Sequence, residues 1–490
     1  MSTPTTAQKS SGVKKSPAYM INSLITIAIM LICGMLPPFA PITQLGMQVA
    51  GIFIGLIYGW TTVGLIWPSM LGMILLGLTS YGSINQVLIE GFGSSTVVMI
   101  LFILIFAAAV TASGVSRFIA MWFVTRKLLL GRPWLFSGIF LFVSFLLSAT
   151  VNTLASIIIC WGILYDVSLS LGYKKGDLYP ALMILGVTIF ATIGMGAFPY
   201  KLIPLLVLGA YQKMGGMGVN YFNFVCVYWA LMLVILLGYL LLCRFVFRAD
   251  VSPIAGINAE TFKDMDLTLD KRQKITLVFL AALIILLLSP SLMPKGFFLK
   301  TFLDTIGAVG TIMLVVLTMV CIKIDGKPLI EFRQMAVEGI QWDPLILTAA
   351  ALPVVNALTA EGTGIKEFLI QALGPLLLGR SVLTFAIISL GLALLITNFA
   401  NNGMTALILM PVIVSFSGAL GANPMAMIVL LIFVVHVAVM TPAACPMAAM
   451  LHGNTEWITT VQIYKYGGIT VLWVLFVILA VGIPLSNLLL

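Results

Sequence analysis

Apolar stretches long enough to cross a lipid bilayer follow one another along almost the whole chain. A membrane-spanning helix needs about 20 predominantly apolar residues. Candidate spans lie at approximately 20–36, 46–58, 61–79, 97–125, 179–210, 222–247, 274–291, 303–322, 344–373, 424–452 and 464–488. Because a bilayer offers no water to backbone amides and carbonyls, such segments fold as helices. The sequence therefore predicts an all-α polytopic membrane protein with about eleven transmembrane helices.

The composition excludes the main soluble alternatives. Of the 490 residues, 61% are apolar and 8% are charged, whereas soluble domains carry about 25% charge. A cytosolic enzyme, a secreted disulfide scaffold and a disordered chain are thereby excluded. The six cysteines are scattered without metal-binding spacing, so we expect no metal cofactor. The net charge of +9 is better explained by cytoplasmic loops of a membrane protein than by a nucleic-acid partner.

Two further apolar stretches, 134–168 and 381–418, have polar residues at their centres. The first contains Asn152 within Ser-Ala-Thr-Val-Asn-Thr, and the second contains Asn401 and Asn402 within Thr-Asn-Phe-Ala-Asn-Asn-Gly. Asparagine is costly at mid-membrane depth, and non-helical backbone is tolerated there only inside protein. We therefore interpret both stretches as re-entrant hairpins, each entering and leaving on one side.

The distribution of basic residues predicts the orientation in the membrane. With residues 1–18 as a cytoplasmic tail, eleven spans and two hairpins leave only Lys213, Lys295, Lys300 and Arg380 outside. The other bases then lie on the cytoplasmic side, in agreement with the positive-inside rule. This topology places the C-terminus outside and suits an integral protein of the cell's inner (cytoplasmic) membrane.

The chain divides into two membrane halves that resemble each other. Residues 19–247 form the first half with hairpin 134–168, residues 248–274 a polar cytoplasmic linker, and residues 275–490 the second half with hairpin 381–418. An offset of 250 pairs the segment 111–120 with 361–370 and Asn152 with Asn402, and an offset of 247 pairs Pro199 with Pro446. An odd number of crossings separates equivalent elements, so the two repeats are predicted to be inverted, as in many secondary transporters.

Each half also contains a span that is interrupted near its middle. The interruptions are Gly-Met-Gly-Ala-Phe-Pro-Tyr-Lys at 194–201 and Thr-Pro-Ala-Ala-Cys-Pro at 441–446. Proline removes an amide donor and glycine loosens the backbone, so both segments are expected to break the helix. Broken helices place amide ends, which attract a carboxylate, and carbonyls, which can coordinate sodium, near the membrane midplane. Matched breaks and hairpins favour a transporter over a set of ordinary proline kinks.

Several segments resemble the divalent anion/sodium symporter family of the wider ion transporter superfamily. They are Gly-Ile-Phe-Ile-Gly-Leu-Ile-Tyr-Gly-Trp-Thr-Thr from residue 51, Ser-Gly-Val-Ser-Arg-Phe-Ile-Ala from residue 113 and Gln-Trp-Asp-Pro from residue 341. The resemblance covers nearly all of residues 46–490. It implies a homodimer in which a scaffold domain holds the interface and a transport domain moves as an elevator.

The resemblance also implies a binding site at the hairpin tips and broken helices. The family's Ser-Asn-Thr corresponds to Val-Asn152-Thr153 in the first hairpin and to Asn401-Asn402-Gly, followed by Thr405, in the second. Its Thr-Pro-Pro-Asn corresponds to Phe-Pro-Tyr-Lys and to Cys-Pro-Met-Ala in the breaks. The candidate substrate-binding residues are Asn152, Thr153, Asn401, Asn402, Thr405, Pro199, Lys201, Cys445 and Pro446. Asn152 and Asn402 are also candidate ligands of sodium, the one coupling ion that the resemblance implies.

Two residues leave alternatives open. Lys201 stands where the family has asparagine, so it either replaces a bound sodium or contacts the substrate anion, or instead extends toward the aqueous outer end of its helix. His436, ten residues before Pro446, either relays protons or contacts substrate, or is a neutral side chain bonded to a backbone carbonyl.

The sequence therefore predicts a secondary active transporter of small organic anions, of the di- or tricarboxylate class. Elevator-type alternating access would carry the anion, with sodium symport or anion exchange. The alternative is a cation/proton or arsenite-type antiporter of the same superfamily, which would favour buried carboxylates near the breaks. An intramembrane enzyme is not supported, since the sequence has no His-Glu-x-x-His motif, no paired membrane aspartates and no Gly-x-Ser-x-Gly at a span. The lack of a nucleotide-binding loop argues against an ATP-driven pump.

Overall fold

The computed structural model describes residues 17–129, 131–256, 268–360, 362–377 and 380–490. Most of these residues are helical, and nine helical segments among them are long and apolar enough to cross a membrane. The predicted all-α polytopic membrane fold is confirmed. The predicted tail, 1–18, lies outside the described residues except for its last two, as does 257–267 of the predicted linker.

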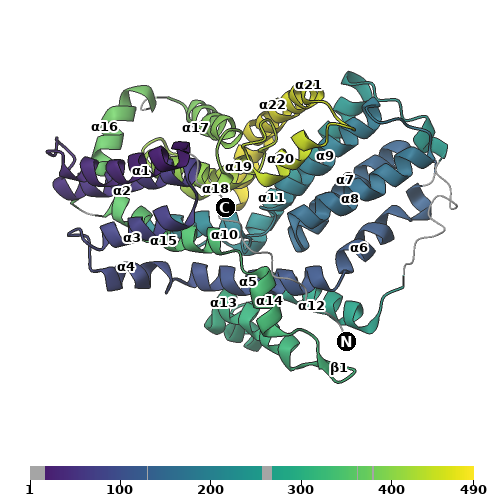
Figure 1. The fold of residues 1–490 in the computed structure, drawn as a ribbon, viewed down its shortest axis with the longest axis horizontal. Coiled ribbons are helices and arrows are strands. Elements are labelled where there is room, and N and C mark those ends of the chain that lie inside the picture. The colour runs from purple at the N-terminus through teal and green to yellow at the C-terminus, as the bar shows by residue number, and fades with distance from the viewer. Residues whose placement is uncertain (1–16, 130, 257–267, 361, 378–379) are drawn as a thin grey trace.

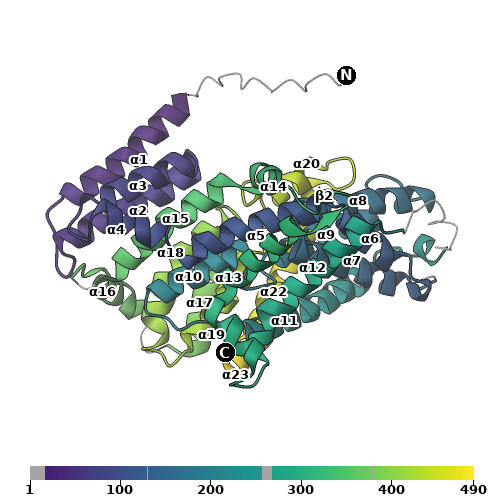
Figure 2. The same ribbon diagram turned by 90° about the horizontal axis from the view of Figure 1, so that it is seen from below.

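The first half of the chain forms a series of helices with short connections. Its elements are α1 (Pro17–Met35), α2 (Gln44–Thr62), α3 (Ile66–Leu76), α4 (Ile84–Gly91), α5 (Ser95–Ala112), α6 (Val115–Val124), η1 (Lys127–Leu129), α7 (Pro133–Thr150), α8 (Thr153–Ser170), α9 (Leu178–Gly194), α10 (Leu202–Lys213), α11 (Tyr221–Leu241) and η2 (Leu242–Val246). Figures 1 and 2 show α1–α4 gathered at one end of the molecule and α6–α8 at the other.

The second half follows a similar order after a short 3₁₀ turn, η3 (Pro253–Gly256). Its elements are α12 (Lys271–Leu288), η5 (Ser289–Ser291), α13 (Phe298–Cys321), β1 (Lys323–Ile324), β2 (Lys327–Pro328), α14 (Phe332–Gly339), α15 (Trp342–Thr359), α16 (Ile365–Leu377), α17 (Val382–Thr397), α18 (Asn402–Ser417), α19 (Pro424–Val435), α20 (Pro446–Gly453), α21 (Thr460–Gln462), η6 (Ile463–Gly467), α22 (Gly468–Val477), η7 (Ile478–Gly482) and α23 (Ile483–Leu489). The antiparallel pair β1–β2 pairs Lys323 with Pro328.

Left-handed glycines mark the same point in both halves. Gly114 (φ 75°) separates α5 from α6, and Gly364 (φ 70°) lies directly before α16. Glycine adopts this conformation without steric cost, which is why the expected spans 97–125 and 344–373 are each divided into two helices. The two glycines are 250 residues apart, as the predicted repeat requires.

Both predicted hairpins consist of two helices joined by a short break. In the first, α7 and α8 are separated by Val151 and Asn152, and the Ser156 hydroxyl donates to the Ser144 carbonyl at 2.7 Å. That bond joins the two arms side by side. In the second, α17 and α18 are separated by residues 398–401. Each arm of the first hairpin has 18 residues, about the length of a span, so entry and exit on one side remains a prediction.

Contacts between loops support the inverted arrangement. The start of α9 and the end of α20 lie at one face, where Lys175 pairs with Glu456 and Asn454 donates to the Tyr165 hydroxyl at 2.7 Å. The first broken span thus begins where the second one ends. At another place, the Asn223 amide donates to the Leu489 carbonyl at 2.6 Å, which brings the C-terminus to the start of α11.

The two broken spans occupy the core. Every residue of α9 after Leu178, and every residue of α19 after Pro424, is buried. Helices that are apolar on all sides are expected in such positions. Because neighbouring helices surround α9 and α19, the interruptions at their ends lie inside protein, where non-helical backbone can be tolerated.

Candidate functional site

The first hairpin tip is joined to the first broken span through hydroxyl groups. Asn152 caps α8, since its Oδ1 accepts from the Ala155 amide at 3.2 Å. The Ser148 hydroxyl donates to the Ala191 carbonyl at 2.5 Å and lies 2.8 Å from the Thr153 hydroxyl. Because Ser148 has a single hydroxyl proton, Thr153 is the donor to Ser148. The tip is therefore fixed to α9 about one turn before that helix ends.

The second tip repeats this pattern. Asn401 caps α18 and accepts from the Gly403 amide at 3.0 Å. The Thr397 hydroxyl donates to the Val435 carbonyl at 2.8 Å and lies 3.3 Å from Asn402 Oδ1. Thr405 is fully buried, and its hydroxyl donates to the Asn401 carbonyl at 3.1 Å. This tip is fixed to the end of α19 as the first is fixed to α9.

The contacts correct the pairing of the hairpins by one residue. The N-cap asparagines are Asn152 and Asn401, and the residues that face a hydroxyl five positions earlier are Thr153 and Asn402. The structural offset is therefore 249, and the predicted pairing of Asn152 with Asn402 is wrong. Two adjacent asparagines made the identity match ambiguous, whereas the N-cap position, which asparagine favours, resolves it.

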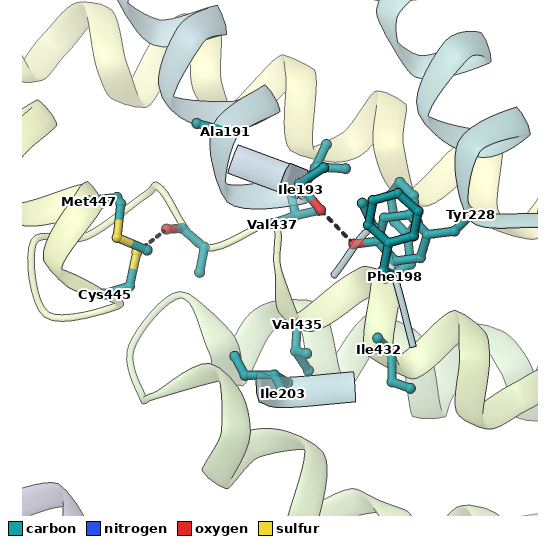
Figure 3. Close-up of a cluster of buried hydrophobic side chains, with 14 of the residues drawn as sticks. Ala191, Ile193, Phe198, Ile203, Tyr228, Ile432, Val435, Val437, Cys445 and Met447 are labelled. Carbon is teal, nitrogen blue, oxygen red and sulfur yellow. Dashed lines mark hydrogen bonds between the residues drawn. The ribbon is translucent and has the colours of Figure 1, made fainter. Parts of the chain in front are cut away.

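Aromatic side chains stabilise the break between α9 and α10. The Tyr228 hydroxyl donates to the Ile193 carbonyl at 2.8 Å (Figure 3), and the Trp229 indole donates to the Ala197 carbonyl at 3.1 Å. The Ala197 carbonyl lies beyond the end of α9, and the Ile193 carbonyl lies in the last turn of that helix, where it also accepts from the Gly196 amide. The break is therefore a hydrogen-bonded structure that α11 supports.

A single asparagine shapes the break between α19 and α20. Asn398 Oδ1 accepts from the amides of Val439 and Met440 at 3.0 and 2.9 Å, and its amide donates to the carbonyls of Leu394 and Val437. The Thr441 hydroxyl donates to the Asn398 carbonyl. The helix consequently ends at Val435, six residues before the predicted break at 441–446.

The N-caps after the two breaks are Lys201 and Cys445. Lys201 caps α10 without a side-chain bond to its amides, whereas Cys445 accepts from the Ala448 amide at 3.4 Å. These caps are 244 residues apart, as are the carbonyls of Ala191 and Val435 that receive the hairpin hydroxyls. The predicted pairing of Pro199 with Pro446 at offset 247 is therefore wrong. Pro199 is buried within its break, and Pro446 is exposed at the first turn of α20.

The two breaks cross at Gly196 and His436. A Cβ at Gly196 would lie 2.7 Å from His436 Nδ1, so only glycine permits this approach. His436 is fully buried and its Nδ1 lies 2.6 Å from the Ile432 carbonyl. This contact agrees with the predicted alternative of a histidine bonded to backbone. Within the described part of the chain, its Nε2 has no hydrogen-bond partner.

Lys201 folds back onto the first hairpin. Its Nζ donates to the Ser148 carbonyl at 3.0 Å, and a cavity of about 20 Å³ beside it is lined by Ala149, Thr150 and Val151. The predicted alternative, in which Lys201 extends to the aqueous end of its helix, is contradicted by this contact. A larger cavity of about 350 Å³ touches Pro199.

The candidate residues thus form two half-sites. Asn152, Thr153, Pro199 and Lys201 belong to the first, and Asn401, Asn402, Thr405, Cys445 and Pro446 to the second. Among the described residues no hydrogen bond joins the two hairpin tips. The two half-sites meet instead where Gly196 of the first break packs against His436 of the second. In the described residues no cluster of histidine, cysteine or carboxylate side chains could hold a metal.

Sequence reasoning missed four residues that build the half-sites: Ser148, Thr397, Asn398 and Tyr228. A signal for the first two was present, since each hydroxyl stands five positions before a polar tip residue. Asn398 belongs to the polar centre of the second hairpin, but its role, like that of Tyr228, carried no signal, because their break partners lie about 35 to 40 residues away in the chain.

Comparison with known proteins identifies the family. The model of the citrate transporter family (CitMHS) matches residues 53–433, and no curated protein sequence matches the chain. Among solved structures, the chain is similar to the YdaH transporter of Alcanivorax borkumensis, described as having an unusual topology. The similarity has a TM-score of 0.56 and 14% sequence identity, and it covers 96% of each chain. At this identity the similarity shows the fold alone.

The family match spans most of the chain, including both hairpins and the first break, and it ends at Phe433, just before the second break. It confirms the predicted transporter and places the chain among carriers rather than enzymes. The chain belongs to the citrate transporter family.

Proposed function

We propose that the protein is a secondary active carrier of small organic anions, of the di- or tricarboxylate class. The observation that carries this proposal is that four helices, α8, α10, α18 and α20, begin at the hairpin tips and breaks. Helix N-termini present unpaired amides and positive dipole ends, which favour an anion. Lys201 adds a formal positive charge to the same region.

The absence of acidic side chains from these segments disfavours the cation/proton antiporter. Residues 148–153, 195–201, 397–405 and 436–446 contain no aspartate and no glutamate. A carrier that binds protons or metal cations in a membrane requires negative or readily ionised ligands. Four positive helix ends and a lysine would oppose such a substrate.

The cavity that reaches Pro199 is large enough for a small carboxylate. Its volume is about 350 Å³, and Ser95, Gln212 and Tyr221 are among its lining residues, while binding sites for small ligands usually measure about 300–1,000 Å³. We propose that the anion enters through this cavity and binds at the tips, where Asn152, Asn401 and Asn402 offer amide donors.

Hydrogen bonds within each half-site favour movement of a tip together with its broken span. The bonds Ser148–Ala191 and Thr397–Val435 are buried, so separating tip from span would leave polar groups unpaired at a cost of about 1–3 kcal/mol each. We propose that hairpins and broken spans move as one transport domain in an elevator mechanism, within a homodimer. Sodium symport and anion exchange both fit this arrangement.

The proposal is tested by uptake of labelled citrate, succinate and malate into proteoliposomes. We expect Asn152→Ala, Asn401→Ala and Asn402→Ala each to reduce uptake at least about tenfold, since each removes an amide donor from the site. The matched control is Asn423→Ala, which removes the N-cap at the end of α19 away from the second tip.

All four variants should remain folded, because loss of an N-cap costs only about 1 kcal/mol. Asn402→Ala, which does not remove an N-cap, loses the hydrogen bond from the Thr397 hydroxyl, at a similar cost. Wild-type protein that neither transports nor is stabilised by any carboxylate would contradict the proposed function. Tip variants that transport like the control would contradict the site.

A further inference from the structure

The Ser148 carbonyl, in the last turn of α7, has no amide partner within its own helix. The last four carbonyls of a helix lack intrahelical amide partners, and Ser148 lies in the last turn of α7 (Pro133–Thr150). Its carbonyl accepts the Lys201 ammonium at 3.0 Å. A side chain from the first break therefore supplies a positive charge to the negative end of a hairpin helix.

The second half has no such charge. By the offsets of the hairpins and the breaks, the counterparts of the Ser148 carbonyl and Lys201 are the Thr397 carbonyl and Cys445. The Cys445 thiol is neutral and donates to the Ala438 carbonyl at 3.2 Å. Within the described residues no side chain donates to the Thr397 carbonyl, which stands at the last residue of α17. The side-chain hydrogen bonds of Thr397 are made by its hydroxyl.

Lys201 has no acidic partner in the described structure. The ion pairs found there are Lys175–Glu456 and Lys300–Asp304, both remote from the tips in sequence. An ammonium held inside a membrane protein requires a counter-charge or dipolar partners. The Ser148 carbonyl supplies a dipole but no full negative charge, which the proposed anionic substrate would supply.

The C-terminal ends of half-helices are positions at which transporters hold coupling cations. An ammonium donated to such an end provides the same unit charge but cannot dissociate. We propose that Lys201 is a fixed cation of the first half-site, which takes the place of a dissociable coupling cation, so that any cation required for transport binds in the second half-site alone. This inference rests on the proposed anion transport.

The test compares anion binding and uptake in choline, potassium and sodium media. For the wild type we expect a sodium dependence of first order or none. Lys201→Asn places a short amide oxygen opposite the Ser148 carbonyl and leaves space for a small cation. We expect its anion affinity in choline to fall about tenfold or more, to recover in sodium, and to show a sodium order one higher than that of the wild type.

Two further variants sharpen the comparison. Lys201→Ser should behave like Lys201→Asn, and Lys213→Gln, at the exposed other end of the same helix, should behave like the wild type. Melting curves would verify that all variants are folded. Sodium dependence of second order or higher in the wild type overturns the inference. Unchanged anion affinity of both Lys201 variants in choline also overturns it. So does a loss of anion affinity that sodium restores in neither Lys201 variant.

These outcomes are separate from failure of the proposed function. If no carboxylate binds to the wild type in any medium, the anion carrier itself is refuted. If carboxylates bind to the wild type, and the Lys201 variants match Lys213→Gln in every medium, only the fixed cation is refuted.

Discussion

At the scale of single residues, the crossing of the two breaks depends on close approach. Gly196 lies against the His436 ring, while the Tyr228 hydroxyl bonds to the nearby Ile193 carbonyl. The Tyr228 and Phe433 rings pack with centroids 4.5 Å apart, which brings α11 against α19. Residues from three elements therefore determine the position of one break relative to the other.

Gly196→Ala should destabilise the protein by about 1–3 kcal/mol through overpacking. The added methyl would lie 2.7 Å from His436 Nδ1 and still closer to the Tyr228 hydroxyl oxygen, and neither side chain can withdraw without disturbing its own hydrogen bond. The matched control is Gly162→Ala in α8, where a Cβ has no neighbour within 4 Å and where alanine gains up to about 1 kcal/mol of helix propensity.

Thermal unfolding of the purified variants measures this difference. A lower melting temperature for Gly196→Ala, together with an equal or higher one for Gly162→Ala, is the expected result. Equal melting temperatures would show that the crossing is looser than the distances indicate.

The sequence predicted residue types better than it predicted partners. Asn152, Thr153 and Asn402 lie at the tips as expected, because asparagine inside an apolar stretch is costly without a purpose. The predicted pairing of Asn152 with Asn402 was wrong because it matched residue types, whereas the equivalent residues are those that cap the helices. Ser148 resembled an ordinary helical serine until its contact with the Ala191 carbonyl was known.

At the scale of elements, Asn398 has a role that no residue of the first half shares. It is 4% exposed and makes four side-chain hydrogen bonds, three to the second break and one to the Leu394 carbonyl within α17. The amides of Val439 and Met440, which would continue a helix, bond to its side chain instead. The course of the chain after α19 therefore depends on a residue from the hairpin.

Asn398→Ala should cause a large loss of stability and of transport. The change leaves two amides and the Val437 carbonyl without their partner, at a cost of about 1–3 kcal/mol for each unsatisfied buried group. Asn423→Ala is the matched control, because Asn423 only caps the outer end of α19 and its loss should cost about 1 kcal/mol.

The melting temperatures of the two variants distinguish these roles. Asn398→Ala should melt well below Asn423→Ala. If the two melt together, the break is stabilised by the surrounding packing rather than by Asn398.

Elements with a local cause were predictable, and those with a distant cause were not. Proline and glycine indicated the break at 194–201, and buried asparagines indicated both hairpins. The sequence from Val434 to Met440 is Val-Val-His-Val-Ala-Val-Met, which has no helix breaker and looks helical. It unwinds because Asn398 offers its amides other partners.

At the scale of the whole molecule, two groups of contacts between the halves lie at different faces of the protein. Lys175 and Glu456 form an ion pair at one face, and the Tyr165 and Trp457 rings stack beside them with centroids 4.8 Å apart. Asn223 and Leu489 are bonded at another. In the proposed orientation the first group is cytoplasmic, and the second group lies outside.

Cysteine labelling with an impermeant reagent tests this orientation. In a variant in which the six native cysteines are replaced, single cysteines at Lys213 and Leu488 should react in intact cells, since the proposed orientation puts both on the outer side. Single cysteines at Lys175 and Glu456 should react only after the membrane is opened.

Labelling of all four positions from the same side would contradict the topology. Exchange of the two pairs, with Lys175 and Glu456 labelled in intact cells, would reverse the orientation. The sequence predicted this grouping from charge alone, whereas the pairing of Lys175 with Glu456 required the folded chain.

The fixed charge of Lys201 makes transport depend on the membrane voltage. A dissociable cation leaves with its anion, but Lys201 stays. A carrier that binds a divalent anion and no further cation therefore moves with one net negative charge, and the empty carrier returns with one positive charge. Each elementary charge that crosses 100 mV changes the energy by about 2.3 kcal/mol. With a negative interior, the voltage pushes the loaded carrier outward and draws the empty one inward. The resting potential of the cell would then favour expulsion of the anion rather than its accumulation.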